Sequence, residues 1–221
     1  THNLQASASW PLPTTHYPLP TTHYPLLPYL RRKDPPDRPR MGFALGNAFA
    51  GTVVKRYLGI DPGLNRTGYA LLERTADGPK LLEGGIIGST PAQPLAVRVH
   101  EIGDGLRDVL REFRPEAMAI EQIFSHPGHP KTAVLMAHAR GAILFAAADA
   151  GVPIVHYTPR QIKKLLTGSG KASKEQVQAA IQRELGLDAV LEPNDVADAF
   201  AIALCHYYSV RLDERQLSQV G

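Results

Sequence analysis

The sequence predicts an α/β domain with a five-stranded mixed sheet, partly antiparallel and partly parallel, flanked by helices. Apolar periodicity begins near Lys55 and continues to about Leu212, which is long enough for one domain. The first three strand-like segments follow one another through short turns, as in an antiparallel meander. Two later strand-like segments are short, apolar and separated by helical patterns, which is typical of parallel strands with helical crossovers.

The three strands of the meander are expected over residues 53–61, 67–73 and 80–89. Pro62-Gly63 and Asp77-Gly78-Pro79 separate them, and these residue types favour tight turns. A helix is expected next because apolar residues recur at spacings of three and four, at Leu95, Val99, Ile102, Leu106, Val109 and Phe113. Pro115 ends this helix.

The second half of the domain alternates strands and helices. Two buried strands are expected over 117–121 and 153–157, where short apolar runs lie between helix-breaking residues. Three more helices are expected over 131–150, over 173–185, and from about 193 to 208. We place the domain at residues 53–210, followed by a C-terminal tail at 211–221.

The first 52 residues differ in composition from the domain. The heptapeptide PLPTTHY occupies 11–17 and again 18–24, and nine of the 19 prolines lie in the first 39 residues. Proline twice per repeat excludes a coiled coil, so we expect a disordered or polyproline-like extension over 1–52. Two alternatives remain: an arm whose basic residues contact phosphates, or a natural start further along the chain. The residues concerned are Arg31, Arg32 and Lys33 for the arm, and Met41, Val53 or Val54 for the start.

Net charge and cysteine content exclude only a few classes of protein. The net charge of +3 lies entirely in residues 1–54, because residues 55–221 hold 19 basic and 19 acidic groups. The basic isoelectric point is therefore no argument for nucleic-acid binding. One cysteine, Cys205, excludes an intrachain disulfide and a multi-cysteine metal site. Without a long apolar run or a signal pattern, we expect a soluble, cytoplasmic protein.

Four acidic residues stand where burial disfavours an unpaired charge. Asp61 and Glu121 each end an apolar strand, and Asp195 and Asp198 lie three residues apart on one face of the last helix. Such carboxylates repel one another unless a divalent cation lies between them, and oxygen ligands suit Mg²⁺ or Mn²⁺ rather than zinc. Two bridged ions of this kind activate water and stabilise the leaving oxygen in phosphodiester cleavage.

Each acid taken alone also has a simpler interpretation. Asp195 could complement the helix dipole, Asp61 could form a turn before Pro62, and Glu121 could cap a loop. Asp198, one turn further into the helix between two alanines, is the hardest to explain in this way. The joint occurrence of the four acids in this order of strands and helices favours a functional site.

Three segments resemble the RuvC family of Holliday junction resolvases. They read LGIDPGLNRTGYALLE at 58–73, AIEQIF at 119–124 and NDVADAFAIALCH at 194–206. The resemblance covers residues 55 to about 210 and implies a ribonuclease-H-like fold. It also implies that four acids are catalytic and ligate metal, namely Asp61, Glu121, Asp195 and Asp198. Some family members have histidine at the position of Asp195.

The resemblance implies a structure-specific endonuclease that resolves four-way DNA junctions in recombination and repair. Paired, symmetric nicks would leave 5′-phosphate and 3′-hydroxyl ends and would need Mg²⁺, with Mn²⁺ as a substitute and two ions per site. It further implies a homodimer, coupled to a branch-migration complex similar to RuvA and RuvB. We take helix 131–150 as the candidate dimer contact, through Leu135, Ala139, Ile143 and Ala146.

Contacts to DNA are expected from one aromatic and several basic residues. Phe124 resembles the aromatic residue that the family stacks on an unpaired base, although it could be a core phenylalanine. Residues 159–174 contain no acid and five basic residues, which indicates a phosphate-binding surface or, alternatively, a solvated face. These five are Arg160, Lys163, Lys164, Lys171 and Lys174, of which Lys163 and Lys174 match family positions near the active site. We interpret His126 and His129 as ordinary loop histidines.

Three other functions compete with this interpretation. The first is another nuclease of the same fold, such as the YqgF-like group that processes RNA, but those proteins are shorter and nothing in this sequence favours them. The turn from Asp61 to Gly63 also resembles the phosphate-binding turn of the actin and sugar-kinase ATPases, which need two such domains. A junction-binding module without catalytic activity is the third alternative.

Overall fold

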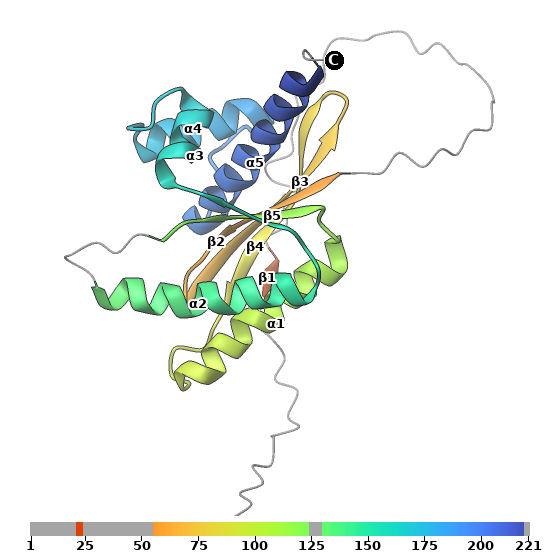
Figure 1. Ribbon diagram of the computed structural model, residues 1–221. Helices are drawn as coiled ribbons and strands as arrows, with labels where there is room; N and C mark the ends of the chain where they lie inside the picture. The colour runs from red at the N-terminus through yellow and green to blue at the C-terminus, as the bar shows by residue number, and fades with distance from the viewer. Residues whose placement is uncertain (1–20, 24–54, 124–129, 219–221) are drawn as a thin grey trace, which may run out of the picture.

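The computed structural model describes residues 21–23, 55–123 and 130–218 (Figure 1). Its sheet has the strand order β1-β4-β3-β2-β5-β6. The antiparallel meander comprises β2 (Arg56–Asp61), β3 (Arg66–Thr75) and β4 (Gly78–Gly88). On the other side of β2, β5 (Ala117–Glu121) runs parallel to it, and β6 (Ile154–Tyr157) runs parallel to β5. The predicted five-stranded mixed sheet is therefore confirmed.

A sixth strand, β1 (Thr21–His23), joins the edge of this sheet and pairs antiparallel with β4. It comes from the second copy of the heptapeptide, where the sequence predicts no strand. The predictions for the rest of residues 1–52 lie outside the described residues. The same is true of Phe124, His126 and His129.

Helices cover both faces of the sheet (Figure 1). On one face lie α1 (Leu95–Phe113) and α2 (Pro130–Asp149); on the other lie α3 (Pro159–Thr167), α4 (Lys174–Leu185) and α5 (Asn194–Ser218). Since side chains alternate along a strand, each strand contributes to two cores. Met118 packs with the α1 and α2 side, whereas its neighbour Ala119 packs with the α5 side. None of the helices in the described residues is long and apolar enough to cross a membrane.

The sequence pattern does not predict α3, because this amphipathic helix is short and its basic residues interrupt the apolar pattern. Thr158 caps α3 through a reciprocal capping box with Gln161, and Pro159 occupies a favoured first position. Ile162 is buried against the α5 side of the sheet. Gly168 ends α3 in the left-handed conformation, with a φ of 80°.

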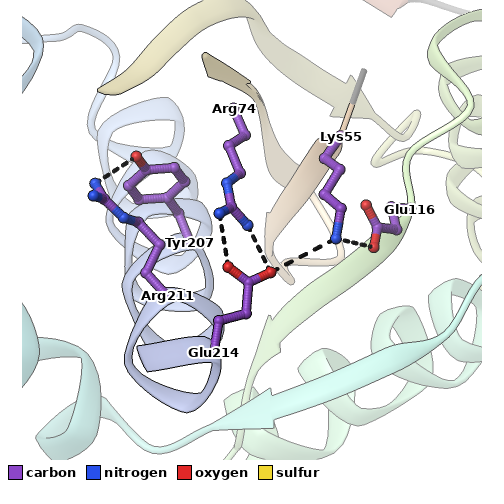
Figure 2. Close-up of polar contacts among 6 residues, drawn as sticks. All are labelled: Lys55, Arg74, Glu116, Tyr207, Arg211 and Glu214. Carbon is purple, nitrogen blue, oxygen red and sulfur yellow. Dashed lines mark hydrogen bonds and ion pairs between the residues drawn. The ribbon is translucent and has the colours of Figure 1, made fainter. Parts of the chain in front are cut away.

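The last helix was predicted to end near Tyr208, but α5 continues to Ser218. Residues 211–218 of the predicted C-terminal tail thus belong to α5. Figure 2 shows the reason: Arg74 on β3 donates two hydrogen bonds, of 2.8 and 2.7 Å, to the carboxylate of Glu214. Lys55 lies between Glu214 and Glu116, 3.8 and 3.4 Å away. These contacts tie the end of α5 to the start of the sheet.

The predicted dimer contact on α2 is wrong for three of its four residues. Ala139, Ile143 and Ala146 are fully buried within the same chain, and Ile143 and Ala146 pack in the core between α1 and the sheet. Large apolar side chains are instead exposed elsewhere on α2, at Val134, Leu135 and Phe145. The sequence pattern could not separate these faces because α2 is apolar or small on nearly all sides.

Candidate active site

Two of the predicted acids lie together at one edge of the sheet because their strands are parallel neighbours. Ile60 of β2 is in register with Ile120 of β5, and Asp61 and Glu121 are the next residues of each strand. Strand alternation directs both toward the face that α5 covers. The carboxylates of Asp61 and Glu121 therefore lie close together, at the carboxyl ends of two adjacent parallel strands.

The turn that follows Asp61 does not depend on its carboxylate. Thr67 closes this turn: its hydroxyl donates to the carbonyl of Gly63 at 2.8 Å and accepts from the Gly63 amide at 3.3 Å. Among the described residues, no hydrogen bond joins the Asp61 side chain to the turn. The structure therefore gives no support to the interpretation of Asp61 as a simple turn residue.

The first turns of α5 bring Asp195 and Asp198 to the same edge. They can do so because glycines let the helix backbone lie directly on the sheet. A Cβ atom at Gly59 of β2 would lie 2.2 Å from the carbonyl oxygen of Ala199, and one at Gly68 of β3 would lie 2.0 Å from that of Asp195. Both distances are too short for any side chain.

The four carboxylates lie close enough for their charges to affect one another. Burial first, and then the charges of Asp198, Glu121 and Asp195, raise the pKa of Asp61 from 3.8 to about 7, although Lys174 opposes the shift. Burial, followed by the charge of Asp198, likewise raises the pKa of Glu121, and here Lys163 opposes it. A site that disfavours its own negative charges in this way is suited to a bound cation.

Both acids of α5 are paired with a cation of the protein. The Nη2 atom of Arg66 lies 3.0 Å from Oδ2 of Asp195, and Nζ of Lys174 lies 2.9 Å from Oδ2 of Asp198. Asp195 also stands in the first turn of α5, so it does complement the helix dipole as the simpler interpretation requires.

The donor set fits a hard divalent cation by its chemistry, since it offers only carboxylate oxygens and carries excess negative charge. As the side chains stand, however, no group of three or more His, Cys, Asp or Glu in the described part of the chain is placed to hold a metal ion. In this arrangement the Oδ2 atoms of Asp195 and Asp198 each face a cation of the protein, Arg66 and Lys174.

The five predicted basic residues differ in how close they lie to the acids. Lys163 on α3 and Lys174, the first residue of α4, are close enough to the acids to affect their pKa values. Lys164 lies on a different side of α3 and lines a cavity of about 340 Å³ with Tyr157 and Cys205. The other two, Arg160 and Lys171, are exposed.

Two arginines that the sequence does not predict also lie at this site. Arg66 pairs with Asp195, as described above. Arg140 of α2 approaches from the opposite face of the sheet and donates to the backbone carbonyl of Glu121, while its Nη2 lies 2.6 Å from Nδ1 of His156. A lone arginine in the alanine-rich stretch AHARGAILFAAA was the available signal for Arg140.

Comparison with known proteins decides the family. The family model described as "Crossover junction endodeoxyribonuclease RuvC" matches residues 57–206. The chain belongs to the RuvC family. A RuvC of Rhodopirellula baltica is 52% identical over 153 residues, which cover 68% of this chain and 85% of the relative. A RuvC of Syntrophomonas wolfei is 44% identical over 158 residues, covering 71% of this chain and 91% of the relative.

Solved RuvC structures agree with this assignment. The structure of RuvC from Thermus thermophilus matches with a TM-score of 0.67 and 37% identity, covering 72% of this chain and 96% of that chain. The structure of the same protein in complex with a Holliday junction substrate matches with a TM-score of 0.65 and 38% identity, covering 70% of this chain and 94% of that chain. The predicted ribonuclease-H-like fold is confirmed, and the enzyme class is that of RuvC, a metal-dependent crossover junction endodeoxyribonuclease.

Proposed function

We propose that this enzyme resolves four-way DNA junctions in recombination and repair. It makes paired, symmetric hydrolytic nicks in strands of like polarity and leaves 5′-phosphate and 3′-hydroxyl ends. The observation that carries the proposal is the meeting of Asp61, Glu121, Asp195 and Asp198 at one edge of a RuvC-family sheet. The Thermus thermophilus relative, solved with a Holliday junction substrate, supports the choice of DNA.

The four acids would hold the divalent ions, which we take to be two Mg²⁺ per site with Mn²⁺ as a substitute. Bound there, such ions lower the pKa of water and stabilise charge on the leaving oxygen. Asp61 and Glu121 supply ligands from fixed strand ends, and Asp195 and Asp198 supply them from one helix face. Lys163 and Lys174 stand beside the acids, where they can hold the scissile phosphate and stabilise its developing charge.

The DNA surface extends from the acids along α3 and the start of α4. It comprises five basic residues: Arg160, Lys163, Lys164, Lys171 and Lys174. They lie in segment 159–174, which contains no acidic residue, so this segment is positively charged although the domain as a whole is neutral. Phe124 follows shortly after Glu121 in the sequence, and we propose that it stacks on an unpaired base.

Two symmetry-related strands must be cut at one junction, and a two-fold homodimer supplies two matched sites. We propose that the exposed apolar residues of α2 form the contact between the protomers. Val134, Leu135 and Phe145 are all more than 40% exposed, which is uncommon for large apolar side chains on one helix. The enzyme would act on cytoplasmic DNA, with a branch-migration complex similar to RuvA and RuvB as a further partner.

Cleavage of a synthetic four-way junction, labelled on each strand in turn, tests this proposal. Wild type, Asp61→Asn and Asp108→Asn are compared in Mg²⁺, in Mn²⁺ and in chelator. Asp108 is an exposed acid of α1 that pairs with Arg111 and serves as the matched control. Linear duplex and an RNA–DNA hybrid are tested beside the junction.

We expect symmetric nicks on the junction alone, in either metal, by wild type and Asp108→Asn. Asp61→Asn should bind the junction without cutting it. Cutting of the hybrid in preference to the junction would favour an RNA-directed nuclease. Tight junction binding without cutting in either metal would favour a binding module that lacks catalysis.

A further inference from the structure

Arg66 occupies a place in the site that the proposed metal chemistry does not explain. Its guanidinium pairs with Asp195, one of the four acids, at 3.0 Å. Lys174 forms the equivalent pair with Asp198 at 2.9 Å. Lys174 already has a proposed role at the scissile phosphate, whereas none of the predictions includes Arg66.

The backbone of both elements fixes the pairing of Arg66 with Asp195. Arg66 begins β3, where it is in register with Gly88 of β4, and the bonds of Thr67 to Gly63 hold the preceding turn. Gly68, two residues along the strand, lies on the same face as Arg66 and against the backbone of Asp195. The backbone of Asp195 therefore lies against the strand that carries Arg66, two residues away from it.

This arrangement places a cation of the protein in competition with a bound metal ion. The Oδ2 atom that faces Arg66 belongs to a carboxylate that we propose as a metal ligand. The pair is also partly open to water, with 48% of the Arg66 side chain and 35% of the Asp195 side chain exposed. Such pairs are weak because solvent screens them, so a divalent cation can replace the guanidinium.

We propose that Arg66 is a positioning residue that holds Asp195 in the metal-free enzyme, yields it to the incoming ion, and then contacts a phosphate of the bound strand. This inference rests on the proposed function, because it takes Asp195 to be a metal ligand. The exchange keeps Asp195 ordered and its charge balanced before the ion arrives. It also makes the guanidinium available for DNA only in the metal-loaded enzyme.

Binding of Mn²⁺ alone to the metal-free full chain, followed by electron paramagnetic resonance, tests the first half of the exchange. Arg66→Gln should bind Mn²⁺ about two- to five-fold more tightly than wild type, the size expected for release of a partly exposed ion pair. Arg66→Lys should lie between them. Arg111→Gln removes the same charge from an exposed i,i+3 pair on α1 and should bind Mn²⁺ as wild type does.

Junction binding tests the second half. In Ca²⁺, with the strands checked to be uncut, Arg66→Gln should bind the junction several-fold more weakly than wild type. In chelator the two should bind alike, because Arg66 is then engaged with Asp195. A general loss of positive charge would instead weaken binding equally in both conditions.

Unchanged or weaker Mn²⁺ binding by a folded Arg66→Gln would overturn this inference while leaving the proposed function intact. If wild type itself binds no more Mn²⁺ than Asp61→Asn does, the metal site fails, and the proposed function and this inference fall together. Thermal unfolding monitored by circular dichroism establishes that each variant is folded.

Discussion

At the scale of single residues, Asp61 is held where its charged form is disfavoured. Burial and three neighbouring carboxylates raise its pKa from 3.8 to about 7 in the folded protein. In the unfolded chain the pKa returns to its ordinary value. Between about pH 4 and pH 7 the folded state therefore binds more protons than the unfolded state. The contribution of Asp61 to stability is complete below this window and is lost as the pH rises through about 7.

The Asp61→Asn variant should be more stable than wild type in metal-free solution at about pH 8, by on the order of 1–3 kcal/mol. Its free energy of unfolding should also vary less with pH across the window. Urea unfolding in chelator at a series of pH values measures both effects, and Asp108→Asn should follow wild type. An Asp61→Asn protein that is less stable than wild type at this pH would contradict the prediction.

Arg140 connects α2 to the ends of two strands and contacts the backbone of Glu121, one of the four proposed catalytic acids. It donates to the backbone carbonyl of Glu121 and lies 2.6 Å from Nδ1 of His156. Burial, and then the charge of Arg140, lower the pKa of His156, which favours the neutral imidazole that can accept from a guanidinium. Arg140 therefore fixes the backbone position of Glu121 at the end of β5.

Arg140→Gln should lower kcat for junction cleavage by about 10- to 100-fold, as the loss of a group that orients a metal ligand commonly does, with little change in KM. Arg140→Lys keeps the charge and should recover part of the rate. Single-turnover cleavage at saturating and limiting junction measures the two parameters separately. A change confined to KM would indicate that Arg140 acts on DNA binding instead.

The residues that the sequence predicted at this site share one property. Each of the four acids is unusual for its place, because a carboxylate that ends an apolar strand or lies in an apolar helix needs a compensating partner. Arg66 carries no such signal, since an arginine is acceptable at any half-exposed position, and Arg140 is marked only as a lone arginine in an alanine-rich stretch. Their partners lie 129 and 19 residues away along the chain, so only the folded arrangement reveals them.

At the scale of elements, the site depends on how closely α5 lies on the sheet. A methyl group at Gly59 would lie 2.2 Å from a backbone oxygen of α5, and that oxygen cannot move without shifting the helix. Gly59→Ala should therefore destabilise the protein by about 1–3 kcal/mol, the usual cost of overpacking a core, and should weaken Mn²⁺ binding.

Gly141→Ala is the matched control for Gly59→Ala. Gly141 is an exposed residue within α2, and a Cβ there would meet nothing within 4 Å. Because alanine favours the helix, this variant should gain about 0.5–1 kcal/mol and bind Mn²⁺ normally. Chemical unfolding and metal titration of the two variants check the prediction, and equal effects of both substitutions would contradict it.

The sequence predicts best the elements whose apolar pattern directly reflects their burial. The bounds of α1 and β5 agree with prediction, because a regular apolar stripe and a short apolar run between breakers mark them clearly. The missed helix α3 has only Ile162 fully buried, and the last part of α5 is held by Arg74 and Lys55. Contacts between residues so far apart in sequence leave no local pattern.

At the scale of the whole molecule, the sheet separates two tasks. The face that carries α3, α4 and α5 holds the acids and the basic residues proposed to contact DNA. The face that carries α1 and α2 is covered by α2, whose exposed apolar residues are the proposed contact with a second protomer. An enzyme that cuts two strands symmetrically needs its partner contact to leave both active sites open to DNA, and this division allows it.

Phe145→Glu tests the division of tasks directly. The Phe145 side chain is 63% exposed on α2, with the Arg107 guanidinium 5.7 Å from its ring centre. A buried carboxylate in the dimer contact would oppose association, so the variant should sediment as a monomer at concentrations where wild type is a dimer. Leu212→Glu, at a 47% exposed apolar residue of α5, should remain dimeric.

The products of cleavage should separate loss of the dimer from loss of the active site. On a supercoiled plasmid that extrudes a cruciform, two coupled nicks give linear DNA, whereas a single nick releases the supercoiling, removes the junction and leaves an open circle. Phe145→Glu keeps all four acids, so it should yield open circles at a reduced rate, while wild type and Leu212→Glu yield linear DNA. A Phe145→Glu protein that stays dimeric and still linearises the plasmid would show that the protomers associate through another surface.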